Sequence, residues 1–164
     1  MIEQLIYEMI KINGNDSKRI EHALKVHAFS KSIANGENLD SKALSIIESA
    51  SILHDIGIQQ CINKYGKSNG QLQQIEGPKV AKDILEKLGY TEEFIGRVEY
   101  LISKHHTYKN ANGIDYQILI ESDLIVNAID GNITRNALKK AVSILFKTET
   151  GKHIAQNQFK SHDH

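Results

Sequence analysis

His54 and Asp55 stand side by side at the end of an otherwise apolar stretch, and Gly57 follows them. An unpaired carboxylate is costly to bury, so Asp55 needs a partner if this stretch lies inside the protein. A metal ion would serve both side chains, because histidine and aspartate are common ligands of first-row metals. An ordinary helix C-terminus with a surface histidine gives the same pattern. The pair alone therefore leaves both interpretations open.

His22 is a second candidate ligand. It stands five residues before His27, which places the two rings about 140 degrees apart around a helix. His22 shares an apolar stripe with Val26, Phe29 and Ile33, whereas His27 lies beside small residues. We therefore expect His22 to face the core and His27 to lie at its margin.

Asp123 interrupts the strongly apolar segment 114–129. It shares a helical face with Leu119 and Val126, whereas Glu121 lies about 200 degrees away and is expected to face solvent. A carboxylate on an apolar face needs a cation or several hydrogen bonds. A metal site explains such residues on three separate helices better than unrelated core residues do. The inward-facing candidate ligands are His22, His54 with Asp55, and Asp123.

The elements that must position these residues are helical. Proline occurs once, and strict period-two alternation does not persist, so we predict no sheet. The expected fold is all-α, a compact single-domain bundle of about six to eight helices. Residues 1–164 form the domain, with a core of about 17–147 between a short N-terminal helix and a C-terminal helix or tail. The expected helices cover about 5–12, 16–35, 40–57, 78–88, 91–106, 114–129 and 132–146, and 57–77 is interpreted as a long polar loop.

The composition excludes several classes of function. The formal net charge is zero, which gives no support for nonspecific binding to nucleic acid or membranes. No stacking motif, basic groove or zinc-finger spacing indicates a nucleic-acid reader. The single cysteine, Cys61, fits a reducing compartment, and no apolar run is long enough to cross a bilayer. The N-terminus lacks the features of a signal peptide, so we expect a cytoplasmic protein.

The order and spacing of the candidate ligands resemble the HD-domain superfamily of metal-dependent phosphohydrolases. The matching segments are 19–26, 50–57 and 121–127, which lie in order along the chain. The resemblance implies an all-helical frame and one coordinated ion. Its implied ligands are His22, His54, Asp55 and Asp123.

Some members of this superfamily hold a second ion. In this chain His105 and His106 stand near the later of the two additional histidine positions, and Glu76 stands where the earlier one is expected. Glu76 is equally well explained as an acid near a helix N-terminus, where the helix dipole favours it. We expect His105 or His106 beside the metal, as a ligand or a proton donor. The choice between one ion and two stays open.

The resemblance implies hydrolysis of a phosphoester or phosphoanhydride by a metal-bound hydroxide, with a nucleotide or another small phosphorylated metabolite as substrate. Catalytic roles fall to Asp55, His106 and Arg19. Arg19 lies one turn before His22 and is the first candidate for phosphate binding. Weaker candidates are Lys104, Lys109, Lys64 and Lys67 for the phosphate, and Tyr65 and Gln73 for a base.

The mixed set of histidine and carboxylate ligands suits iron, manganese, nickel, cobalt or zinc. Two other functions remain as alternatives. A di-iron oxygenase would need two irons and would consume oxygen, whereas a non-enzymatic regulatory module would bind a ligand without turnover. A homodimer formed through the N-terminal helix is a further expectation about partners.

Overall fold

The computed structural model describes residues 1–160, which form nine helices and no strand. The all-α fold is therefore confirmed, and no helix in this range is long and apolar enough to cross a membrane. The helices are α1 (Ile2–Asn13), α2 (Ser17–Gly36), α3 (Ser41–Leu53), α4 (Ile58–Tyr65), α5 (Gly70–Lys87), α6 (Glu92–Lys104), α7 (Ile114–Ile129), α8 (Arg135–Leu145) and α9 (Glu149–Asn157).

Side-chain caps start the helices that carry the candidate site. Asp16 accepts a hydrogen bond from the first turn of α2, Asp40 does the same for α3, and Thr91 for α6. Each cap satisfies a backbone N–H group that has no partner within its own helix. The expected starts of these three helices are therefore confirmed.

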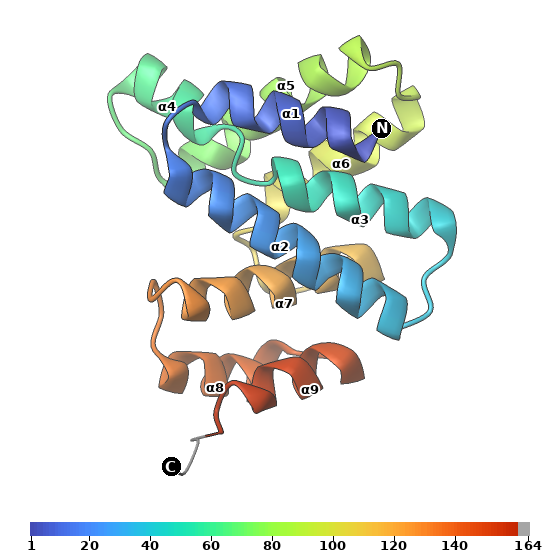
Figure 1. Cartoon of the computed structure of the whole chain (residues 1–164), viewed down its shortest axis with the longest axis vertical. Helices are drawn as coiled ribbons and strands as arrows, with labels where there is room; N and C mark the ends of the chain where they lie inside the picture. Colours follow the sequence, from blue (N-terminus) through green and yellow to red (C-terminus); the bar gives the residue numbers. More distant parts are fainter. Residues whose placement is uncertain (161–164) are drawn as a thin grey trace.

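Helix α7 lies at the centre of the bundle, between α2 on one side and the α8–α9 pair on the other (Figure 1). It also contacts α3, and every residue from 115 to 126 is buried. All faces of this part of α7 are thus interior. Any polar side chain on it must find a partner within the protein.

The expectation that Glu121 faces solvent is wrong. Its side chain is 0% exposed and accepts hydrogen bonds from the hydroxyl and N–H groups of Thr148, the N–H of Lys147 and the side-chain amide of Gln117. These donors replace the water that the carboxylate loses on burial. The helical-wheel argument failed because it assumed one buried face, whereas α8 and α9 cover the second face of α7.

The interpretation of residues 57–77 as one polar loop is also wrong. They contain all of α4, and α5 begins at Gly70, so Pro78 lies inside α5 and does not start it. Helix α4 buries only Cys61, which gives too few apolar positions for a recognisable period. The close approach of Gly57 to Gly77 ties the two helices together, because a Cβ on Gly57 would lie 2.6 Å from the backbone nitrogen of Gly77.

Candidate metal centre

His54 and Asp55 lie in the turn that follows α3, because that helix ends at Leu53 rather than at Gly57. The His54 ring is 1% exposed, and its Nδ1 donates a hydrogen bond to the carbonyl oxygen of Ser51 at 2.7 Å. This bond fixes the ring and leaves Nε2 as the ligand atom of the neutral form. The Nε2 atom lies 3.3 Å from Oδ2 of Asp55.

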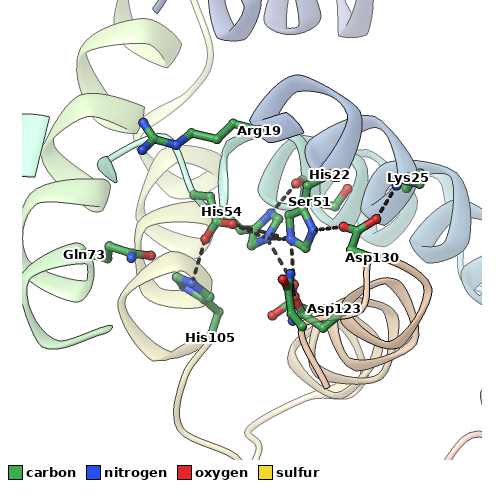
Figure 2. A network of polar contacts seen from close by, with 12 residues as sticks. Arg19, His22, Lys25, Ser51, His54, Gln73, His105, Asp123 and Asp130 are labelled. Atoms are coloured by element: carbon green, nitrogen blue, oxygen red, sulfur yellow. Dashed lines mark hydrogen bonds and ion pairs between the residues drawn. The ribbon is translucent and has the colours of Figure 1, made fainter. Parts of the chain in front are cut away.

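His22 reaches the same point from α2. Its Nε2 lies 3.0 Å from Oδ1 of Asp123 on α7 and 3.3 Å from Nε2 of His54. The Oδ2 atom of Asp55 lies 3.5 Å from Nε2 of His22. Figure 2 shows these rings converging on Asp123. The four predicted ligands therefore come together, with ligand atoms of His22, His54 and Asp123 within 4.8 Å of one another.

His105 brings a third buried ring to this centre. It follows the last residue of α6, is 1% exposed, and donates from Nδ1 to the carbonyl oxygen of Ile102 at 2.6 Å. Its buried Nε2 has no hydrogen-bond partner and lies 3.3 Å from Oδ1 of Asp55. Asp55, His105 and His106 form a second group of candidate ligands within 4.8 Å. Asp55 thus lies between the two groups, with one oxygen near each.

Glu76 belongs to neither group. It is 2% exposed and accepts hydrogen bonds from the hydroxyl of Tyr65 at 2.7 Å and the ammonium of Lys64 at 3.0 Å. Lys79 lies 3.6 Å from the same carboxylate oxygen. Since α5 begins at Gly70, Glu76 is also too far along the helix for the dipole explanation. The structure shows it as a buried link between α4 and α5.

Of the residues predicted to bind phosphate, only Arg19 lies at a cavity beside the metal centre. Arg19 lines a cavity of about 420 Å³ that also borders His22 and Asp55. Its Nε lies 3.1 Å from Oδ2 of Asp16, whereas its buried Nη1 has no partner. Lys104 and Lys109 are exposed and do not line this cavity.

The charges of the four ligands are strongly coupled. Burial alone would lower the pKa of His54, but the charge of Asp55 and hydrogen bonds with Asp123 and Asp55 raise it well above its usual value. Burial also lowers the pKa of His22, but the hydrogen bond with Asp123 and the charges of Asp55 and Asp123 outweigh this effect and raise it. The pKa values of Asp55 and Asp123 are held low despite burial, mainly by the two histidines and His105.

The formal charges of the donor set fit a divalent cation. Two imidazolium ions and two carboxylates sum to zero charge. A divalent ion with neutral imidazoles and the same two carboxylates also sums to zero. An ion can therefore replace two protons at this centre without leaving an uncompensated buried charge.

Asp130 is a residue of this centre that the sequence analysis missed. It follows the last residue of α7, and its Oδ2 accepts a hydrogen bond from Nδ1 of His22 at 2.9 Å. Its other oxygen pairs with Lys25 (Figure 2). The available signal was its spacing of seven residues from Asp123, which places both acids on one helical face.

Asp130→Asn is expected to weaken binding of a divalent ion by about 10–100-fold, as changes to partners of ligating histidines do. The substitution keeps the side-chain volume but removes the charge that orients His22. A metal titration against a competing chelator measures the effect, with the exposed Asp83→Asn as the matched control. An unchanged affinity would show that packing alone orients His22.

Two comparisons relate the chain to known proteins. A family model described as HD domain matches residues 19–132, more than half of the chain. A similar solved structure is the crystal structure of a predicted HD superfamily hydrolase from an uncultured Thermotogales bacterium. The two chains are 24% identical with a TM-score of 0.67, and the match covers 96% of this chain and 83% of that chain. This likeness shows a shared fold. No curated protein matches the chain.

Proposed function

The chain belongs to the HD domain family, and from this premise we propose that it is a metal-dependent phosphohydrolase acting on a nucleotide or another small phosphorylated metabolite. The observation that carries the proposal is the convergence of His22, His54, Asp55 and Asp123 beside a cavity. A bound iron, manganese, nickel, cobalt or zinc ion would supply an acidified water and charge neutralisation at a phosphoryl oxygen.

Arg19, Asp55 and His106 have further roles in this proposal. Arg19 lines the cavity and donates to the phosphate, since charge-assisted bonds from arginine to phosphate oxygens are strong. Asp55 orients water through the oxygen that does not face the first ligand group. Partial burial and the neighbouring His105 lower the pKa of His106, which favours the neutral ring and hence the role of metal ligand over that of proton donor.

The second group of ligands supports a two-ion centre as an extension of this proposal. Asp55, His105 and His106 would hold the second ion, and Glu76 would not, because Lys64 and Tyr65 occupy it. A centre with two irons would also be compatible with the alternative function, an oxygenase. Oxygen consumption that accompanies product formation in the iron-loaded protein would favour that alternative over hydrolysis.

Removal and return of the metal test the proposal. We expect protein treated with a chelator to release no phosphate from p-nitrophenyl phosphate or from a panel of phosphate esters. Reloading with manganese, cobalt or iron should restore release, because positioning and charge neutralisation depend on the ion. A fully loaded protein that releases phosphate from no ester, or a chelated protein that remains active, would contradict the proposed activity.

A further inference from the structure

The cavity beside His22 and Asp55 is lined only by polar residues. Its basic side chains are Lys18, Arg19 and Lys25, all on α2. The cavity measures about 420 Å³, which lies toward the small end of the range of about 300–1,000 Å³ for ligand pockets. Among residues 1–160, no phenylalanine, tyrosine, leucine, isoleucine, valine or methionine lines it. This composition is unusual, because most ligand pockets are lined mainly by hydrophobic and aromatic side chains.

From this lining we infer that the substrate is a phosphomonoester of a small, hydroxyl-rich alcohol, such as a sugar or polyol phosphate, whose body lies in this cavity. The inference rests on the proposed phosphohydrolase function and narrows its substrate class. A nucleobase is a poor occupant, because bases bind proteins largely by stacking on aromatic rings.

The two residues considered for contacts to a base do not line the cavity. Tyr65 donates its hydroxyl hydrogen bond to Glu76. Gln73 lies beside His106, with its Oε1 atom 3.3 Å from Nε2 of the ring. The cavity therefore offers a base no aromatic surface from either residue.

Two amide side chains suit the cavity to hydroxyl groups. Asn132 donates to Oδ1 of Asn127 at 3.1 Å. This bond leaves the amide group of Asn127 and the carbonyl of Asn132 without a protein partner in residues 1–160. A hydroxyl group both donates and accepts, so it can bond to each of these atoms. Both residues line the cavity near the end of α7.

The charges of the lining favour a single phosphate. Glu21 and Asp130 offset two of the three basic residues, because Asp55 and Asp123 are the carboxylates that would neutralise the ion. The lining therefore keeps one net positive charge beside the neutralised ion, which favours a phosphate monoester of charge about −2 over a more highly charged polyphosphate. Glu21 and Asp130 can accept hydrogen bonds from hydroxyl groups but would repel a polyphosphate.

A matched pair of substrates tests this inference. Ribose 5-phosphate and adenosine 5′-monophosphate share the ester bond and the pentose, and they differ in the adenine base. We expect kcat/KM of the metal-loaded protein to be at least about 10-fold higher for ribose 5-phosphate, the worth of about one hydrogen bond or more. An equal or higher value for adenosine 5′-monophosphate would overturn the inference and leave the phosphohydrolase function intact. Failure of every ester, including p-nitrophenyl phosphate, would overturn the function as well.

Asn132→Leu separates the role of the cavity wall from that of the metal centre. The variant removes a hydrogen-bonding group and adds an apolar one, so the ratio of kcat/KM for ribose 5-phosphate to that for p-nitrophenyl phosphate should fall about 10-fold. The exposed Asn157→Leu is the control, and metal content confirms an intact centre. An unchanged ratio would show that the body of the substrate lies elsewhere.

Discussion

Asp123→Ala is expected to lower the affinity for a divalent ion by more than about 100-fold, which exceeds the loss typical for residues that only support a ligand. Oδ1 of Asp123 lies 3.0 Å from Nε2 of His22 and 3.3 Å from Nε2 of His54, so the substitution removes an atom on which both rings converge. It also removes one of the two negative charges that a divalent ion needs at this centre. His54→Ala should have an effect of the same size.

Elemental analysis of the purified proteins measures this loss, with the exposed Asp83→Ala as the control. Circular dichroism of each variant establishes that it is folded. Two equivalents of metal in the wild type would assign His105 and His106 to a second ion, and one equivalent would support a single-ion centre. Retention of all metal in folded Asp123→Ala and His54→Ala would show that the ion is bound elsewhere.

Helical periodicity was enough to turn His22 and Asp123 toward one another, because both residues lie on regular helices. His22 and Asp123 each share a stripe with apolar residues, and the period of a helix is enough to turn such residues inward. His54 lies just past the end of α3, but its backbone is still helical, so the same period also turned it inward. The structure brings them together as this argument requires.

The parts that the sequence did not predict depend on contacts between distant segments. Glu121 is buried because α8 and α9 return over α7, and three of its four donor groups belong to residues 26 and 27 positions later. Glu76 is held by two side chains of α4, a helix with one buried residue. Asp130 acts through His22, which is 108 residues away in the sequence. The periodicity of apolar residues along a helix cannot predict partners that are distant in the sequence.

The affinity for a divalent ion should fall steeply as the pH drops below the raised pKa values of His22 and His54. Both rings are protonated in that range, and the ion must displace both protons, so the affinity changes by up to about 100-fold per pH unit. Isothermal titration at several pH values, in buffers of different ionisation enthalpy, measures the affinity and the number of protons released. An affinity that does not change with pH would contradict the replacement of two protons by the ion.

The stability of the metal-free protein should follow the opposite trend. A raised histidine pKa stabilises the folded state fully below the unfolded-state pKa, and this contribution is lost as the pH rises through the folded-state pKa. The lowered pKa values of Asp55 and Asp123 stabilise the folded state above the usual pKa of aspartate, and that contribution is lost only in acid. Raising the pH from mildly acidic to alkaline should therefore lower the Tm without metal and increase the difference in Tm that manganese or cobalt produces. The pH dependence of the metal affinity and that of the metal-free Tm should cover the same pH range, because the same two protons stabilise the metal-free centre and compete with the ion.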